Sequence, residues 1–485
     1  MMGYARLGGP IAAFGLALLV LGTTRRDRIA GLGFAVVGAC VLAASLAPNK
    51  PGEIVGGVAG ALAIGSALAY LFRRVPWLLP VAALACIPIR VGALGHQLLV
   101  PLYVVVIGAA LALGWDLVHG ELEARELGVI AWPLATYVGW TCLSLGWTKD
   151  VHEGATEVLA FYVPFTILAI AIARLPWDRL GLRALYVELT TMAVVFAAVG
   201  FYQYRTRNIF ENPKVINSNA YAAFFRVNSV FWDPSVYGRF LVVAMIPSVL
   251  FVVRARSPRL QWAAVAVLVV SWLGLLISFS QSSFAALLVA LIGVAFLLWR
   301  WRAVGAVALA ALVLGGLAFA QPQVRRSIQH HTSSGLNSAT SGRASLVANG
   351  IRIAATHPAL GVGVGGFKHA YAARVKRLHG KKNLKTAASH DTPVTVAAET
   401  GLPGLLFFAW LLVALFRQAF RSRRMVSLAA GLGLAAILCH SLFYNDFFED
   451  PTTWLLIGLV AFAIDRVDPA EQRAAIVEQR EAVAA

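Results

Sequence analysis

The chain has 485 residues, of which 59% are hydrophobic and only 13% are charged, and its mean hydropathy is +0.73. Soluble domains carry about 25% charged residues. The sequence therefore lacks the polar surface that a soluble enzyme, a disordered chain or a fibrous repeat would show. Repeated apolar runs of about 18 residues or more predict an all-α polytopic membrane protein. Strands of a membrane barrel alternate apolar and polar residues, which these runs do not.

We predict fifteen apolar spans, the first and last of them short, and hence about 12–15 transmembrane helices. In chain order they cover residues 7–23, 29–47, 54–72, 75–95, 98–115, 127–147, 155–173, 183–204, 236–253, 260–280, 283–299, 303–320, 393–416, 425–443 and 452–465.

Arginine is concentrated in alternate connections between these spans. The positive-inside rule places such connections in the cytoplasm. The connections between them carry few basic residues and should lie outside. The arginine-rich set is Arg25, Arg26, Arg28, Arg73, Arg74, Arg174, Arg179, Arg183, Arg254, Arg256, Arg259, Arg300, Arg302, Arg417, Arg421, Arg423 and Arg424.

This orientation divides the chain into six segments. They are N-terminal transmembrane helices (1–204), a first extracytoplasmic loop (205–235), further transmembrane helices (236–320), a long basic extracytoplasmic segment (321–392), C-terminal transmembrane helices (393–465) and a cytoplasmic tail (466–485).

The long segment 321–392 holds eleven Lys or Arg residues, one acid and six of the ten histidines. Its net charge of +10 is more than half of the chain's +18. Long loops escape the positive-inside rule, so this charge is compatible with an outer location. A basic surface outside the cytoplasm and close to the membrane predicts a site for an anionic ligand.

Two helices are expected inside this segment, over 344–356 and 367–378. The second has Phe367, Tyr371 and Val375 on one face and basic residues elsewhere. That pattern is typical of a helix lying at the membrane interface, where it could contact anionic lipid without any catalytic role. The intervening glycine run permits a tight turn and close approach to a ligand, although a purely structural turn explains it equally well.

His390 stands at the outer mouth of the next span, and Glu399 lies within that span. A histidine can act as a base near neutral pH. An acid inside a membrane span is costly and suggests function. We therefore expect His390 to be catalytic. Glu399 should support it by pairing with an arginine such as Arg90 or Arg226.

Arg90 and Arg226 are expected at outer membrane depth. Arginine is the planar, permanently charged donor suited to phosphate, although snorkelling or pairing with an acid is an equally open interpretation. The polar break around Gln281 is a further candidate, or a plain hairpin. The four cysteines all lie inside apolar runs without a CxxC pair, so we expect no metal site and no cofactor.

Taken in order, these motifs resemble the O-antigen ligase and polymerase superfamily. The resemblance covers roughly residues 220–415, and its most specific part is the last motif. The motifs are Arg226 with Trp232-Asp233-Pro234, Ser278 to Ser283, Ser341-Gly342-Arg343, His357 to Phe367, and Ser389-His390 with Glu399-Thr400-Gly401-Leu402-Pro403-Gly404-Leu405.

The resemblance implies a GT-C-like membrane glycosyltransferase of the cytoplasmic (inner) membrane. It would take a glycan from undecaprenyl diphosphate and pass it to a lipid- or glycan-borne acceptor on the outer side, with inversion and without metal. The family's essential arginine falls on Arg343, its essential histidine on His390, and a further arginine on Arg226. We assign diphosphate binding to Arg226, Arg343 and Arg90.

This sequence departs from the family's usual residues at two positions. Asp391 follows the histidine where the family usually has Asn, and Gln281 stands where it often has Arg. We give both a supporting role. The span count also exceeds the twelve expected for ligases. Ligase and polymerase therefore both remain open, and one long late outer segment favours the ligase.

Two other classes of function are alternatives to the transferase. A transporter or flippase of the same lipid-linked glycans should show internal repeats, and none is convincing here. A non-catalytic scaffold would not need His390 and Glu399 at the mouth of one helix. The expected partners are the lipid-linked donor, the acceptor and membrane lipids, with no nucleic acid.

Overall fold

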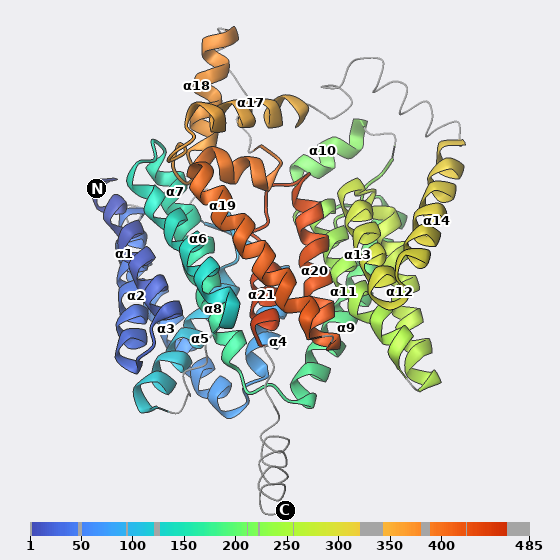
Figure 1. Cartoon of the computed structure of the whole chain (residues 1–485), viewed down its shortest axis with the longest axis horizontal. Helices are drawn as coiled ribbons and strands as arrows, with labels where there is room; N and C mark the ends of the chain where they lie inside the picture. The colour runs from blue at the N-terminus through green and yellow to red at the C-terminus, as the bar shows by residue number, and fades with distance from the viewer. Residues whose placement is uncertain are drawn as a thin grey trace, which may run out of the picture.

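The protein is an all-α membrane protein (Figure 1). The computed structural model describes residues 2–46, 51–93, 96–120, 127–210, 212–221, 224–255, 257–320, 343–379, 389–422 and 424–462. Within these ranges, the strands are confined to one antiparallel hairpin. Eleven of the described helices are long and apolar enough to cross a membrane, and three shorter apolar helices accompany them. This result agrees with the predicted 12–15 spans.

The N-terminal part supplies one side of the bundle. Its elements are α1 (Met2–Leu21), α2 (Arg25–Leu46), α3 (Pro51–Arg74), α4 (Leu78–Cys86), β1 (Val91–Ala93), β2 (His96–Leu98), α5 (Val100–His119), α6 (Ala131–Leu143), α7 (Val151–Glu157) and α8 (Val163–Arg174). A π-helical turn, Val158–Tyr162, joins α7 to α8, so that Val151–Arg174 forms one continuous span.

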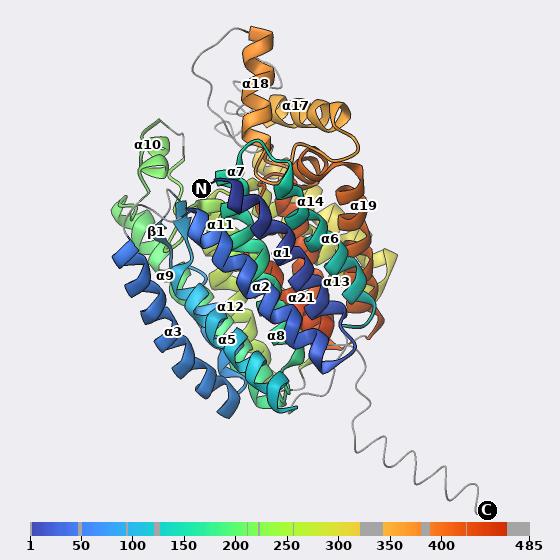
Figure 2. The same cartoon turned by 90° about the vertical axis from the view of Figure 1, so that its left-hand side faces the viewer.

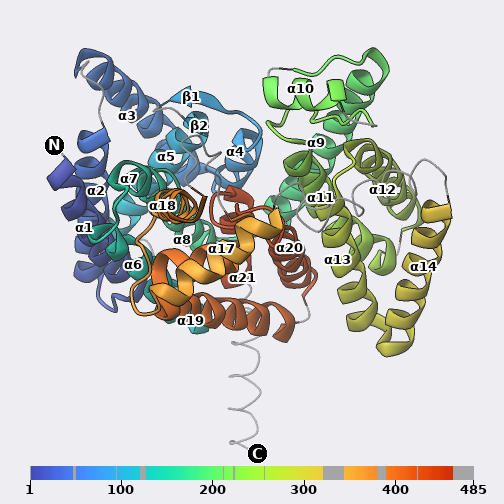
Figure 3. The same ribbon diagram turned by 90° about the horizontal axis from the view of Figure 1, so that it is seen from above.

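The middle part lies on the other side in the view from above (Figure 3). Its helices are α9 (Arg179–Thr206), α10 (Pro213–Tyr221), α11 (Pro234–Arg254), α12 (Pro258–Ser278), α13 (Gln281–Trp299) and α14 (Trp301–Ala320).

The C-terminal part joins the two sides. It consists of α17 (Arg343–Thr356), α18 (Phe367–His379), α19 (Thr392–Arg421), α20 (Met425–Ser441) and α21 (Pro451–Phe462). Helix α20 packs on α11 and α13, while α21 packs on α8. The indole of Trp454 on α21 is fully buried. The core therefore runs through the centre of the bundle, where α8, α11, α20 and α21 meet.

One predicted span was wrong. In place of one span, the described part of this region holds the nine-residue helix α4 and strand β1, which pairs with β2 in a hairpin. Nine residues rise only about 14 Å, which is less than half of the roughly 30 Å hydrocarbon layer. Pro88 cannot donate a backbone hydrogen bond, so the helix ends before it and the chain turns at Ile87 and Ile89.

Helices α10, α17 and α18 lie together at one end of the bundle (Figures 1 and 2). The predicted helices 344–356 and 367–378 are confirmed as α17 and α18. The interfacial placement of α18 was wrong. Its apolar residues Phe367, Tyr371 and Val375 are buried against α17 and α19. Protein packing, and not lipid, therefore covers that face.

Candidate functional site

The glycine-rich loop between α17 and α18 docks on the first turns of α19. The amide of Val362 donates to the carbonyl of Ala398 at 2.9 Å, and that of Gly363 donates to the carbonyl of Glu399 at 2.8 Å. Gly361 has φ +68°, and a Cβ there would lie 2.3 Å from the Glu399 backbone. Glycine is therefore required at this position, and the predicted tight turn serves to bind α19.

The start of α19 fixes the position of His390. The Asp391 carboxylate caps the helix, accepting from the amide of Val394 at 2.9 Å. The Ser389 hydroxyl lies 2.6 Å from that of Thr395. His390 itself has φ +58°, in the left-handed region that side chains other than glycine rarely occupy. The hydrogen bonds of Ser389 and Asp391, on either side of His390, thus keep the histidine in its strained backbone conformation. Helix capping is the supporting role that the structure gives Asp391.

Glu399 has a different partner from the one predicted. Its Oε1 accepts from the backbone amide of Phe367 at 3.1 Å, so the carboxylate anchors the start of α18 and not an arginine side chain. The buried location of this acid was anticipated, and its partner was not. Just beyond it, Gly401 adopts φ +71° and ψ −170° and breaks α19 into two segments.

Arg226 is held against the turn between α12 and α13. Its backbone exchanges two hydrogen bonds with the Asn219 side chain, at 2.8 and 3.1 Å, and its Nε donates to the carbonyl of Ser278 at 3.3 Å. Within the described residues its Nη groups have no hydrogen-bond partner, so they remain for a ligand. Burial lowers the pKa of this guanidinium, and the positive charge of Arg343 lowers it further.

Arg343 and His390 belong to the same cluster. Burial lowers the pKa of His390, and the charge of Arg343 adds to this effect, while the Asp233 carboxylate opposes it. Arg343 is exposed at the first position of α17. The structure therefore brings together three predicted residues, Arg226, Arg343 and His390. The half-buried imidazole is biased toward its neutral form.

A short connection between α20 and α21 completes this region. The ring of Tyr444 meets that of His390 edge-on, with centroids 6.1 Å apart. Arg239, buried on α11, forms ion pairs with Asp446 and with Asp450, the latter at 2.9 Å. Two ion pairs to one buried guanidinium fix this connection against the bundle.

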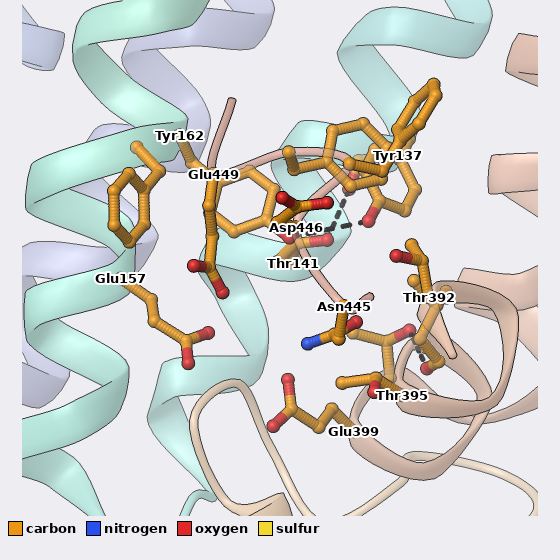
Figure 4. Close-up of a pocket in the computed structure, with 15 residues that line it drawn as sticks. Tyr137, Thr141, Glu157, Tyr162, Thr392, Thr395, Glu399, Asn445, Asp446 and Glu449 are labelled. Carbon is orange, nitrogen blue, oxygen red and sulfur yellow. Dashed lines mark hydrogen bonds between the residues drawn. The ribbon is translucent and has the colours of Figure 1, made fainter. Parts of the chain in front are cut away.

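A cleft of about 700 Å³ opens beside the cluster, among α7, α10, α18, α19 and the hairpin. Its inner part, which we call the acidic chamber, is lined by Glu157, Glu399, Asn445 and Glu449 together with Phe161 and Thr395 (Figure 4). Burial, followed by the charge of Asp446, raises the pKa of Glu449 to about 7.

The two remaining candidates lie at separate places. Arg90 is exposed before β1 and lines the cleft with Lys214 and Trp232, while its Nη1 donates to the carbonyl of Gln97 at 3.4 Å. Gln281 is exposed as the first residue of α13, next to the Ser280 cap. Gln281 therefore lies three residues beyond Ser278, whose carbonyl accepts from Arg226, whereas Arg90 lies on the wall of the cleft.

Sequence reasoning missed the residues of the α20–α21 connection and of α7. Tyr444, Asn445 and Glu449 stand in one of the arginine-poor connections, and Glu157 falls inside the predicted span 155–173. One signal was available. Four acidic or amide side chains fall within six residues, Asn445 to Asp450, between two apolar helices.

The fold and this site define a polytopic helical membrane protein with a cluster of cationic residues beside an acidic cleft at one end of its bundle. Residues 266–409 match the family model described as O-Antigen ligase. This part of the chain is thus similar to the O-antigen ligase family, whose members are glycosyltransferase-like enzymes that use lipid-linked glycans. The match includes Arg343, His390 and Glu399, whereas Arg226 and the α20–α21 connection lie outside it. No curated protein matches the chain.

Proposed function

We propose that the protein is an O-antigen ligase-like glycosyltransferase. It transfers a glycan from undecaprenyl diphosphate to a cell-surface acceptor, on the extracytoplasmic side of the cytoplasmic membrane, without metal and with inversion. The observation that carries the proposal is the placement of Arg343, whose positive charge acts on both Arg226 and His390.

The two arginines suit the diphosphate of the donor. Guanidinium groups bind phosphate oxygens through paired N–H donors and keep their charge at any physiological pH. As the bond between the sugar and the diphosphate breaks, these charges stabilise the negative charge that develops on the leaving group.

His390 then acts on the acceptor. Because its pKa lies below the ordinary value for histidine, the ring is neutral at pH 7 and can accept a proton. The acceptor hydroxyl loses its proton to His390 as its oxygen bonds to the anomeric carbon. The diphosphate leaves from the opposite face with the electron pair of the broken bond. A single displacement of this kind inverts the anomeric configuration.

The extracytoplasmic location rests on the arrangement of the helix ends. Helices α10, α17 and α18 occupy one end of the bundle (Figure 1), whereas the connections α8–α9 and α11–α12 lie at the other. Both of those connections carry arginines of the predicted cytoplasmic set. The positive-inside rule supports placing α17 and α18 outside.

The test uses purified protein, an undecaprenyl-diphosphate-linked glycan and a mixture of acceptors. Arg226→Lys and Arg343→Lys keep the charge and lose the planar fork, so each should lower the transfer rate by roughly 10²-fold. Arg352→Lys, on the exposed face of α17, is the matched control and should transfer normally. Wild-type rates in both arginine variants would contradict the proposal.

The same assay separates the two types of enzyme in the superfamily. A ligase attaches one glycan to a distinct acceptor, whereas a polymerase lengthens lipid-linked glycans without one. We expect a single addition. Movement of the lipid between leaflets without any new glycosidic bond would instead identify a transporter.

A further inference from the structure

The acidic chamber holds more carboxylates than the proposed transfer step uses. Glu157 comes from α7, Glu399 from α19 and Glu449 from the α20–α21 connection (Figure 4). Their side chains point toward a common space, beside the amide of Asn445. The inner pocket alone holds only about 40 Å³, and it shares these residues with the 700 Å³ cleft, whose volume falls within the roughly 300–1,000 Å³ typical of ligand sites.

Several polar atoms of this chamber have no protein partner. Within the described ranges, neither Glu157 nor Glu449 forms a hydrogen bond or an ion pair. The hydroxyl of Thr392, a residue only 3% exposed, lines the same space and also has no partner. Oδ1 of Asp446 is also buried without a hydrogen-bond partner, 4.0 Å from Nδ1 of His440, while its Oδ2 pairs with Arg239. Buried polar groups are normally hydrogen-bonded, so this set calls for a ligand that supplies donors.

The composition of the chamber selects the class of ligand. The outer cleft also holds Arg90, Lys214 and Lys368, the last of them paired with Glu153, but the inner chamber is lined by carboxylates without a Lys or Arg. Carboxylates repel phosphate and other anions. Among the described residues, no group of His, Cys, Asp and Glu is arranged to hold a metal ion. Tyr137, Phe161 and Tyr162 add aromatic surface to the wall. A polyhydroxylated ring, whose hydroxyls donate to carboxylates while its faces contact aromatic rings, fits this combination of donors and surfaces.

The chamber also lies next to the proposed catalytic base. Thr392 and Thr395, two and five residues beyond His390, form part of its wall. Asn445 follows Tyr444, whose ring contacts that of His390. A sugar bound here would therefore lie beside the position of the glycosidic bond that forms.

We propose that the acidic chamber is a saccharide subsite, which binds an uncharged or amino-bearing sugar through Glu157, Glu399, Glu449 and Asn445 and rejects sugars that carry a carboxylate. This inference deepens the proposed function and rests on it for the identity of the reaction, although saccharide binding can be measured without transfer. A partly protonated Glu449 could also donate to a sugar hydroxyl, since its pKa is about 7.

The test measures saccharide binding to the full-length protein in lipid nanodiscs, by saturation-transfer NMR. The probes are diacetylchitobiose (neutral), the glucosamine disaccharide (cationic) and digalacturonate (anionic). We expect signals from the first two, and binding of digalacturonate at least about tenfold weaker because like charges face each other. Equal binding of all three, or binding of digalacturonate alone, would overturn the proposal.

The variant Glu157→Gln/Glu449→Gln keeps the shape of the chamber and removes two charges. It should lose the preference for the glucosamine disaccharide and gain affinity for digalacturonate. Glu188→Gln is the matched control, because Glu188 also has a buried carboxylate oxygen without a partner but does not line the chamber. Unchanged selectivity in the double variant would contradict the assignment. Thr392→Val, which removes one hydroxyl, should weaken neutral disaccharide binding several-fold.

Two further measurements separate this inference from the proposed function. Undecaprenyl diphosphate without sugar should bind the double variant as tightly as wild type; a lost diphosphate affinity would mean that the chamber is not a separate subsite. If the protein binds sugars selectively but never transfers glycan, the proposed function is contradicted and the saccharide subsite is not. If a lipid-linked glycan displaces the disaccharide, the chamber holds the donor's sugar. If both bind together, it holds the acceptor's.

Discussion

Replacing His390 by glycine separates its chemical role from its structural one. The residue has φ +58°, a conformation that costs a side chain other than glycine about 1–2 kcal/mol. Glycine relieves that strain, and its greater loss of backbone freedom on folding, roughly 0.5–1 kcal/mol, partly offsets the gain. His390→Gly should therefore be as stable as wild type, whereas His390→Ala keeps the strained backbone and loses the ring packing on Tyr444.

Both variants should lose transfer activity by about 10²–10⁴-fold, the usual contribution of a general base. Donor binding should be retained, because the arginines provide it. Added imidazole should restore part of the rate in His390→Gly, where the vacated space and the Arg343 and Asp233 charges persist. The assay measures glycosylated acceptor and released undecaprenyl diphosphate, with thermal unfolding in parallel. A rate within tenfold of wild type in either stable variant would refute the assignment of His390 as the base.

Three more predictions follow from the orientation, the electrostatics and the loop packing. Cysteine at the exposed Ala373 should react with an impermeant thiol reagent in intact cells, and cysteine at Arg259 only after lysis; the reverse pattern would invert the topology. Asp233→Asn still caps α11 but removes the charge that raises the pKa of His390, the proposed base, so the acidic limb of the pH–rate profile should shift to lower pH; a shift to higher pH would contradict the stated electrostatics. Gly361→Ala should lower the free energy of unfolding by at least about 1–2 kcal/mol, as measured by thermal unfolding. Gly305→Ala on α14 should not lower it, because a Cβ at Gly305 would have no atom within 4 Å. Equal stabilities of the two variants would argue against the close packing of the glycine-rich loop.

Much of the fold was predictable because hydropathy and helix length carry the signal in membranes. A run of apolar residues must form a helix there, since the backbone has no water to satisfy it. The failure at 75–95 has the same origin. Hydropathy alone does not distinguish a spanning helix from a short helix and hairpin, and only the proline at position 88 marked the difference. The predicted membrane-interface position of the helix with Phe367 and Tyr371 was wrong for a related reason. An apolar helical face does not specify whether lipid or protein covers it.

The sequence predicts those site residues that a motif marks individually. It does not predict the parts of the site that form when segments distant in the sequence come together. Arg343 and His390 stood out as individual residues within motifs. The partner of Glu399 is a backbone amide of Phe367, and no sequence pattern distinguishes one amide from another. Glu157 and Glu449 lie 292 positions apart and meet only because α7 and the α20–α21 connection lie at the same end of the bundle.

The break at Gly401 bears on how the bilayer affects this protein. Membrane helices tilt to match the thickness of the surrounding hydrocarbon. In α19 the change of tilt falls on the long segment after Gly401, because Gly401 interrupts the helix and Pro403 lies two residues further on. The short segment that begins after His390 takes its orientation from the glycine-rich loop docked on Ala398 and Glu399. The geometry around the histidine is thereby insulated from changes in lipid composition, even though its polypeptide continues directly into the membrane.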